Sequence, residues 1–306
     1  MDVRRLELLR ELAERGSITA VARATNRTPS AVSQQLKVLE REAGIPLTER
    51  SGRGIVLTGA GRALAQTATE VAVAIEHAEA VWEDFKQAPR GDVTLTTFPT
   101  GGQMLLPGLL TAIAEVPGLT LSCSDQDPML SDFADLTPDF DIVIADAPGV
   151  LPSWRERGLA VIPLMKEPLD VALPIDHPLA AKATLAPKDL ADVSWIGVPG
   201  GSPYDRILRQ IEAANGAVAR VGQRFLDNGI VEALVASGHG VAILPRFTTR
   251  HHENGLVTRP LTGVVSMRQI FALLRPDRAE RPSVRLVVEA MRTEAIRLQH
   301  QYESLE

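Results

Sequence analysis

Apolar residues recur at helical spacing along the first sixty positions, in three short segments separated by turn residues. A first helix, with leucines along one face, ends at Gly16. A second helix is predicted over residues 17–26 and a third over residues 28–44. Helices this short must share one core, so they indicate a small helical domain at the N-terminus.

The third of these helices has two distinct faces. Val32, Leu36 and Leu39 form its apolar face. The opposite face has small hydroxyls and an amide in its first two turns, where a helix that only needs to stay solvated more often carries Glu and Lys. This polar face consists of Ser30, Ser33, Gln34, Lys37 and Arg41.

The next segment, IPLTERSGRGIVL, predicts two short strands around a Ser-Gly-Arg-Gly turn, which together make a wing. From Leu64 the pattern changes to one long helix, and no Gly or Pro interrupts residues 62–88. Its apolar positions follow an a/d heptad seam. The seam consists of Leu64, Ala68, Val71, Ile75, Ala78, Trp82 and Phe85.

Such a helix either packs on its own domain or pairs with a second copy of the chain. The regularity of the seam favours a dimerising linker that ends at Ala88-Pro89-Arg90-Gly91. Beyond it, buried strands alternate with helices of about 10–15 residues, a pattern that predicts an α/β body with parallel sheets. Its length suits two small α/β lobes with a cleft between them.

Charged residues are distributed unevenly between the N-terminal sixty residues and the rest of the chain. The 306 residues have a net charge of −6, but residues 1–60 hold ten Lys and Arg against seven Asp and Glu, a net of +3 that leaves −9 for the rest. A basic domain on an acidic body is typical of a protein in which only one domain binds DNA. No apolar run approaches the roughly 18 residues of a membrane span.

The N-terminus, which alternates charges and leucines, does not match a secretory signal. The single cysteine, Cys123, excludes an internal disulfide and a multi-cysteine zinc site. These features point to the cytoplasm.

The polar face of the third helix suits DNA. The second and third helices, joined by a turn around Asn26 and Arg27, form a helix-turn-helix. Small hydroxyls allow close approach to base edges, Gln can bond adenine through two hydrogen bonds, and Lys and Arg neutralise phosphate. By itself the helical pattern fits equally well an ordinary three-helix unit with a polar outer face.

A series of residues in one order and spacing favours the DNA-binding interpretation. They are Gly16, Ser17, Ala20, Ala22, Ala31, Val32, Ser33, Gln35, Leu39, Glu40, Gly44, Leu47, Arg50, Leu57, Thr58 and Gly61. In these positions, residues 6–64 resemble the N-terminal domain of the LysR-type transcriptional regulators. The long helix and the α/β region that follow have the order and length of the same family.

The resemblance implies a winged helix-turn-helix, a linker helix and a two-lobed α/β effector domain similar to type 2 periplasmic binding proteins, usually assembled as a homotetramer. The expected domains are therefore 1–60 for DNA binding, 61–88 for the linker and dimerisation helix, and 91–306 for effector binding. Within the last, we expect lobe I at about 91–165 and 266–306, and lobe II at about 166–265.

Some positions depart from the family pattern. Thr48 follows the leucine of the wing, where the family usually has Phe, and Pro29 stands where a glutamine often contacts a base. Gln34 replaces a frequent Arg, so we expect a preference that leans from guanine toward adenine. Arg50 and Arg53, on the wing, are suited to phosphate or minor-groove contacts. The expected DNA-binding residues are Thr28, Pro29, Ser30, Ser33, Gln34, Lys37, Arg50 and Arg53.

Helix starts that directly follow strands are the candidate positions for an effector. Three such junctions occur, at residues 98–102, 200–205 and 227–229. Free N–H groups there favour anions, so a small carboxylate is the expected effector, and plain helix capping without a ligand is the alternative. The resemblance places the effector between the lobes. The expected effector-binding residues are Pro99, Thr100, Gln126, Asp146, Gly201, Ser202 and Asn228.

No residue pattern equips the chain for catalysis. Its six histidines do not stand at metal-ligand spacing, and nucleophile-elbow, Walker and dinucleotide motifs are absent from the sequence. We therefore expect no catalytic residues, no metal and no cofactor. The expected partners are double-stranded DNA with a dyad-symmetric operator, a small-molecule effector, further copies of the chain as a dimer of dimers, and RNA polymerase, with no membrane. The competing interpretation is a solute-binding module or small-molecule enzyme with an incidental helical N-terminal domain.

Overall fold

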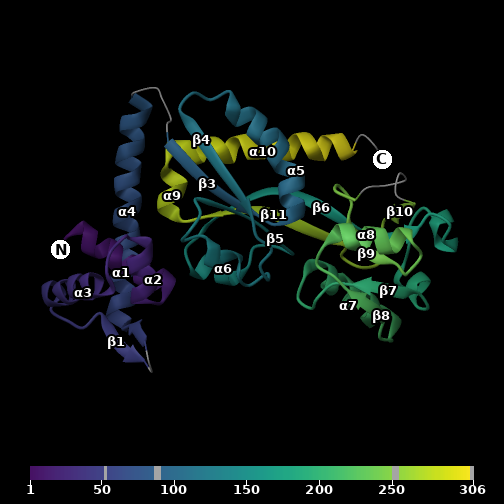
Figure 1. The fold of residues 1–306 in the computed structure, drawn as a ribbon, viewed down its shortest axis with the longest axis horizontal. Helices are drawn as coiled ribbons and strands as arrows, with labels where there is room; N and C mark the ends of the chain where they lie inside the picture. The colour runs from purple at the N-terminus through teal and green to yellow at the C-terminus, as the bar shows by residue number, and fades with distance from the viewer. Residues whose placement is uncertain (52–53, 86–90, 250–254, 304–306) are drawn as a thin grey trace.

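The computed structural model describes residues 1–51, 54–85, 91–249 and 255–303. A small helical domain lies at one end of the molecule, one long helix stands beside it, and an elongated α/β body extends to the other end (Figure 1).

The N-terminal domain contains α1 (Val3–Arg15), α2 (Ile18–Ala24) and α3 (Pro29–Ala43), which confirms the three predicted helices. Glycines in the left-handed conformation end two of them, Gly16 after α1 and Gly44 after α3. The apolar faces of the three helices share one core.

The wing consists of β1 (Thr48–Ser51) and β2 (Gly54–Leu57), paired antiparallel as expected. Thr48, the departure from the family pattern, is held by the end of α3. One carboxylate oxygen of Glu40 accepts hydrogen bonds from the backbone N–H of Leu47 and from the N–H and hydroxyl of Thr48, each at 2.9 Å. The wing is therefore attached through polar contacts at this position.

The long helix α4 (Gly59–Phe85) follows the wing directly. A Cβ atom on Gly61 would lie 2.0 Å from the carbonyl oxygen of Leu47, so the start of α4 passes too close to the wing for any other residue. The helix begins earlier than predicted, and the predicted end around Ala88 to Arg90 lies outside the described residues.

The heptad seam of α4 has two environments. Its first residues, Leu64 and Ala68, pack against the core of the N-terminal domain. Further along, Ile75 and Trp82 are 38% and 59% exposed. The first half therefore packs on its own domain, whereas the second half presents exposed apolar residues, and its pairing with a second copy stays a prediction.

The α/β body is built on a seven-stranded sheet in the order β10-β6-β11-β5-β3-β4, with β9 also paired to β6. Its strands are β3 (Gly91–Thr97), β4 (Leu119–Asp125), β5 (Ile142–Ala147), β6 (Ala160–Pro174), β9 (Ala242–Pro245), β10 (Leu256–Arg259) and β11 (Met267–Leu274). The prediction of parallel sheets is right for β3 with β4 and β5, and wrong for the antiparallel pairs that β6 makes with β9, β10 and β11 and for the pairing of β11 with β5. β6 and β11 are antiparallel because β6 runs from lobe I into lobe II, and the chain returns to lobe I through β11.

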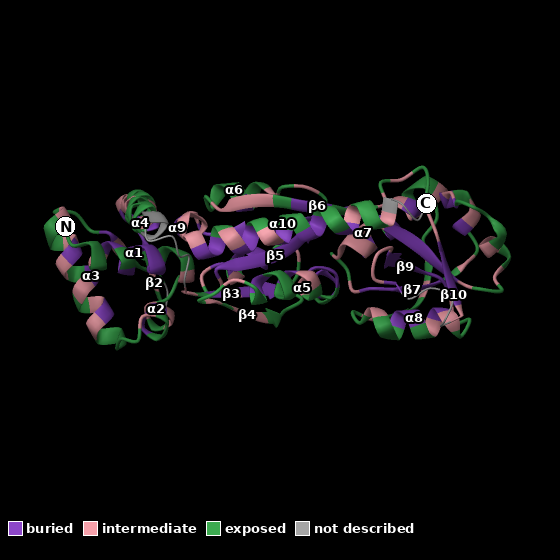
Figure 2. Cartoon of the chain, turned by 90° about the horizontal axis from the view of Figure 1, so that it is seen from above, coloured by how far each residue is buried: buried purple, intermediate pink, exposed green. Residues whose placement is uncertain are grey.

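Two groups of hydrophobic cores divide the body into lobes. Lobe I is the part around β3, β4, β5 and one half of β6 and β11, covered by α5 (Pro99–Ala114) and α10 (Pro282–Glu303). Lobe II surrounds the other half of β6, with α7 (Pro203–Asn215), α8 (Asn228–Ala236) and the parallel pair β7 (Ser194–Gly197) and β8 (Arg220–Arg224). Figure 2 shows the central strands buried and the outer faces of the helices exposed.

Short helices complete the chain: η1 (Phe133–Leu136), α6 (Pro152–Glu156), η2 (Pro178–Ala181), η3 (Pro187–Leu190) and α9 (Pro276–Glu280). Of these, α9 directly follows β11 and lies against α4 (Figure 1). Among the described residues, no helix combines the length and apolar character needed to cross a membrane.

Candidate functional site

The third helix presents the polar face that the sequence predicted. Val32, Leu36 and Leu39 are buried against α1 and α2. The residues on the other side are open to solvent, except that Ser33 is half-buried. The exposed ones are Thr28, Pro29, Ser30, Gln34 and Lys37.

Local capping fixes the start of α3. The Thr28 hydroxyl accepts a hydrogen bond from the N–H of Ala31 at 3.2 Å and lies 3.0 Å from the Ser30 hydroxyl. Asn26, in the turn before it, has a φ of 52°, a conformation that Asn adopts more easily than most residues. An exposed helix start of this kind can accept a DNA phosphate at its free N–H groups.

The two adjacent glutamines of α3 have different environments. The side-chain carbonyl of Gln35 accepts a hydrogen bond from Arg5 Nε at 3.0 Å, which ties α3 to α1. Gln34 is exposed. Its side-chain amide is therefore accessible to a base edge, whereas the side chain of Gln35 is already hydrogen-bonded to Arg5.

The wing contributes one described cation on the expected DNA-binding surface. Arg50 is exposed on β1, opposite Ile55 of β2. Arg53, the second wing residue expected to contact DNA, lies outside the described residues.

A buried arginine joins the two lobes of the body. Arg268, on β11, is only 1% exposed. Its guanidinium donates to Glu167 at 2.8 Å, to Asp146 at 2.9 Å and to the Thr100 hydroxyl at 2.8 Å. It also donates to the Tyr204 hydroxyl at 3.3 Å. We call these five residues the interlobe cluster.

The interlobe cluster draws on both lobes and on the strands that cross between them. Thr100 stands in the first turn of α5 and Asp146 near the end of β5, both in lobe I, whereas Tyr204 begins α7 in lobe II. Glu167 and Arg268 lie opposite each other on the crossing strands β6 and β11. One guanidinium thus has partners on β5, β6, α5 and α7.

Burial dominates the electrostatics of this cluster. It raises the pKa of Glu167 above its ordinary value, although Arg268 acts in the opposite direction. It likewise raises the pKa of the Tyr204 hydroxyl, so this side chain is a neutral hydrogen-bonding group. Desolvation also raises the pKa of Asp127, with a further contribution from the neighbouring charge of Asp146. The carboxyl groups of Asp146, Glu167 and Asp127 thus lie around the buried guanidinium of Arg268.

The other residues expected to bind an effector lie around this cluster at different distances. The side-chain amide of Asn228 donates to the Tyr204 hydroxyl at 3.4 Å. Gly201 is in contact with lobe I, since a Cβ atom there would lie 2.8 Å from the methyl carbon of Met129. Ser202 caps α7 by accepting the N–H of Asp205 at 3.1 Å.

Pro99 and Gln126 are exposed near the start of α5, and the backbone N–H of Gln126 donates to the Thr97 carbonyl at 2.9 Å. The structure thus brings Thr100 and Asp146 together through Arg268 and Asn228 to the cluster through Tyr204, whereas Pro99, Gln126 and Gly201 are exposed.

Sequence patterns missed three members of the cluster: Glu167, Tyr204 and Arg268. A usable signal exists for Arg268, because the segment MRQIFALL places it on the same side of a strand as Ile270 and Ala272. A charge on the apolar side of a strand requires a buried partner. Among the described residues, no group of His, Cys, Asp and Glu is arranged to hold a metal ion.

Comparison with known proteins agrees with this architecture. Residues 3–62 match the family model for the bacterial regulatory helix-turn-helix protein, lysR family, and residues 86–296 match the LysR substrate binding domain. The RuBisCO operon transcriptional regulator of Allochromatium vinosum is 25% identical over 303 residues, covering 97% of this chain and 98% of that protein.

Solved structures share the whole fold. Full-length OxyR from Pseudomonas aeruginosa aligns with a TM-score of 0.64 at 23% identity, over 96% of this chain and 97% of that one. Full-length CbnR complexed with its target DNA aligns with a TM-score of 0.54 at 23% identity, over 96% of this chain and 100% of that one. Since the two family models together account for most of its length, the chain belongs to the LysR-type transcriptional regulators.

Proposed function

We propose that this regulator recognises a dyad-symmetric DNA operator through α3 and the wing, and that a small molecule bound between the lobes controls this recognition. The exposed polar face of α3 carries the first part of the proposal. Ser30 and Gln34 project from a helix that Val32 and Leu39 hold in place, which is the arrangement that a major groove requires.

Operator symmetry follows from the proposed oligomer. The open half of the α4 seam, with Ile75 and Trp82, can pair with the same stripe of a second copy, and paired helices would place two copies of α3 about a two-fold axis. We propose that two such dimers associate, and that the assembly acts on transcription in the cytoplasm with RNA polymerase as a further partner. CbnR, which shares the fold, was solved in complex with its target DNA.

The proposed effector is a small carboxylate that competes with Asp146 for the guanidinium of Arg268. Arg268 already has acidic partners within the chain, so an anionic ligand must replace one of them. Asp146 is the candidate for replacement because it makes one hydrogen bond at the lobe I end, whereas Glu167 is fully buried and also accepts the backbone N–H of Phe247. The hydroxyls of Thr100 and Tyr204 then complete the ligand contacts.

DNA protection on the region upstream of the regulator's own gene tests the first part. The expected result is a protected, dyad-symmetric sequence, and the affinity of the regulator for this sequence should fall steeply as the salt concentration increases. A solute-binding module or an enzyme would give no such protection. The relatives of the chain are transcriptional regulators, which supports the regulator over both alternatives.

Thermal denaturation with a panel of small carboxylates and their matching amides tests the second part. A carboxylate that binds should raise the melting temperature, and its amide should not. In Thr100→Val the rise should shrink, because one hydroxyl contact is lost while the Arg268–Glu167 pair remains. A rise of the same size in Thr100→Val would place the ligand elsewhere.

A further inference from the structure

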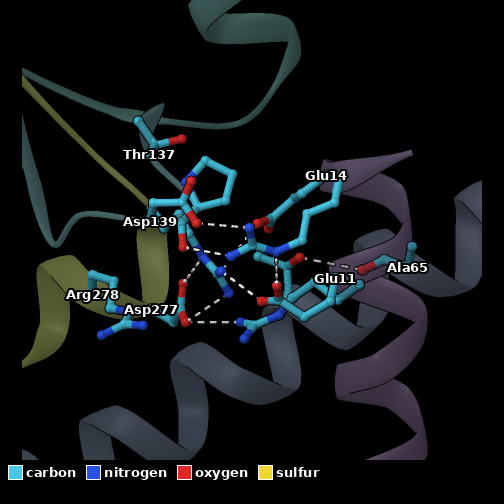
Figure 3. Close-up of polar contacts among 12 residues, drawn as sticks. Glu11, Glu14, Ala65, Thr137, Asp139, Asp277 and Arg278 are labelled. Atoms are coloured by element: carbon cyan, nitrogen blue, oxygen red, sulfur yellow. Dashed lines mark hydrogen bonds and ion pairs between the residues drawn. The ribbon is translucent and has the colours of Figure 1, made fainter. Parts of the chain in front are cut away.

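The DNA-binding domain is attached to lobe I by a network of charged side chains (Figure 3). Helix α1 contributes four of them and the effector body three, from the loop after η1 and from the segment where β11 ends and α9 begins. We call this set the α1–lobe I network. It consists of Arg10, Glu11, Glu14, Arg15, Asp139, Arg275 and Asp277.

Ion pairs cross the boundary in both directions. Arg10 of α1 donates to Asp277 at 2.8 Å, and Arg275 of the body donates to Glu11 at 2.8 Å. Arg275 also lies 3.0 Å from Glu14. At the edge of the interface, Arg15 donates to Asp139 at 2.7 Å and to the carbonyl oxygen of Pro138 at 2.9 Å.

The central pairs are buried although they are ionic. Arg10, Glu11, Arg275 and Asp277 have exposed fractions of 7%, 7%, 3% and 4%. Burial disfavours the charged form of Glu11, but the hydrogen bonds from Arg15 and Arg275 outweigh it and lower the pKa of Glu11. The pKa of Asp277 is lowered in the same way, against burial, by Arg275 and Arg10. Both carboxylates are therefore ionised when the network is closed.

In the described part of the chain, the hydrophobic cores on the two sides of this boundary are not continuous. The core of the N-terminal domain and the core of lobe I form separate clusters. Beside the network, a crevice of about 420 Å³ separates α1 and α2 from lobe I. Separated charges regain hydration, whereas separated apolar surfaces do not, so a contact made of ion pairs can open at a smaller cost than a shared hydrophobic core.

One strand connects this boundary with the interlobe cluster. β11 carries Arg268 at its beginning, and Arg275 follows directly after its end. The two arginines are about 23 Å apart along an extended strand. Between them, β11 is hydrogen-bonded on both sides, to β5 and to β6, so that a shift at one end is transmitted along a stiff element.

We propose that the α1–lobe I network is a releasable latch, which docks the DNA-binding domain on lobe I and is coupled to the interlobe cluster through β11. In the latched state the direction of α3 relative to the body is fixed. Opening the latch releases α1 from lobe I and lets the DNA-binding domain, with its recognition helix, take other orientations. The link to effector control rests on the proposed function, but docking and coupling do not depend on DNA or on a ligand.

The test measures the distance between the DNA-binding domain and lobe I in the full-length protein without DNA. Spin labels are placed on cysteines at two exposed positions, Arg41→Cys on α3 and Glu115→Cys after α5, with Cys123→Ser as the background. Labelled chains are diluted with unlabelled ones, so that distances within one chain dominate. The unaltered network should give one narrow distance distribution.

Arg10→Met is the variant that opens the latch, and the structure offers a matched control. Asp277 is shared by Arg10 and Arg275, and Asp141 is shared in the same way by Arg278 and Arg281 within lobe I. Arg10→Met should raise the population at longer distances about tenfold. Arg281→Met removes an equivalent partner and should leave the distribution unchanged. An unchanged distribution in Arg10→Met, or the same change in both variants, overturns the latch.

Two further variants keep the proposal falsifiable. If Arg10→Met does not fold, Asp139→Asn removes an exposed partner of Arg15 and should broaden the distribution in the same direction; no broadening overturns the latch. Arg268→Lys alters the far end of β11 without touching the network and should also increase the longer distances. No change there overturns the coupling. A narrow distribution in a protein that binds no operator would instead contradict the proposed function alone.

Discussion

At the scale of single residues, Gln34 is the side chain of α3 best placed to distinguish bases. It is exposed, whereas the neighbouring Gln35 is engaged by Arg5. We expect Gln34→Ala to lower discrimination at one or two base pairs of each half-site by about 1–3 kcal/mol, because a bidentate contact to adenine is lost. Selection of binding sites from a random DNA library, compared with the unaltered protein, measures this change.

Lys37→Ala is the matched control on the same exposed face. A lysine that contacts phosphate contributes equally on all sequences, so this variant should weaken binding uniformly and reduce the salt slope by about one. If Gln34→Ala behaved in the same uniform way, the assignment of base recognition to Gln34 would be wrong.

Arg268 gives a second prediction at this scale, on stability and pH. Arg268→Met leaves the carboxylates of Asp146 and Glu167 without their guanidinium, and should lower the free energy of unfolding by about 3–5 kcal/mol at neutral pH. Burial already raises the pKa of Glu167, and loss of Arg268 raises it further.

The sign of the pH dependence follows from that raised pKa. The folded variant keeps a proton on Glu167 at a pH where the unfolded chain has lost it, so its stability falls as pH rises from the ordinary glutamate pKa to the raised one. Urea unfolding at acidic and neutral pH should therefore show a smaller deficit, relative to the unaltered protein, under acidic conditions. A deficit that does not vary with pH would show that Glu167 is not the titrating group.

At the scale of elements, the sequence predicts best what local contacts decide. The bounds of α3 depend on Thr28, Pro29 and Gly44, each of which acts within one turn of the helix. The strand β6 is different, because its extent depends on a distant partner. Its first half pairs with β11, about a hundred positions away, and local patterns do not contain that partner.

The same limit applies to the interlobe cluster. Thr100 and Asp146 were predicted because they stand at a helix start and at a strand end, where ligands commonly bind in α/β folds. Glu167 and Arg268 lie within strands, and their burial depends on each other. A pair of compensating charges can be anticipated only when the pairing of β6 with β11 is known.

The open half of α4 provides the prediction at this scale. Ile75→Glu should prevent pairing of the seams and shift the oligomer toward smaller species, because it introduces like charges into an apolar stripe. Ala74→Glu changes an exposed neighbour off the seam by the same charge, and should keep the assembly. Light scattering coupled to size-exclusion chromatography compares the two masses, and equal masses in both variants would exclude this stripe as the dimer contact.

At the scale of the whole molecule, the position of α3 results from two separate attachments. Helix α4 connects the DNA-binding domain to the body and packs on α9, and the α1–lobe I network holds α1 against the same end of lobe I. Through Arg275 and Asp277, the DNA-binding domain contacts the segment that directly follows β11, the strand that passes through the interlobe cluster. A conformational change between the lobes can thus alter the position of α3 through one continuous segment of chain.

This arrangement makes operator spacing sensitive to the latch. With the network closed, two copies of α3 have a fixed separation. Inserting about 5 base pairs between the half-sites should therefore weaken binding far more than inserting about 10, because about 10 base pairs make one full turn of DNA and return both half-sites to the same face of the duplex. In Arg10→Met the recognition helices can reorient, and the difference between the two insertions should shrink. Gel-shift titrations of both operators measure it with each protein. Equal penalties in the unaltered protein would show that α3 is not held in a fixed orientation, and an undiminished difference in Arg10→Met would show that α4 alone determines that orientation.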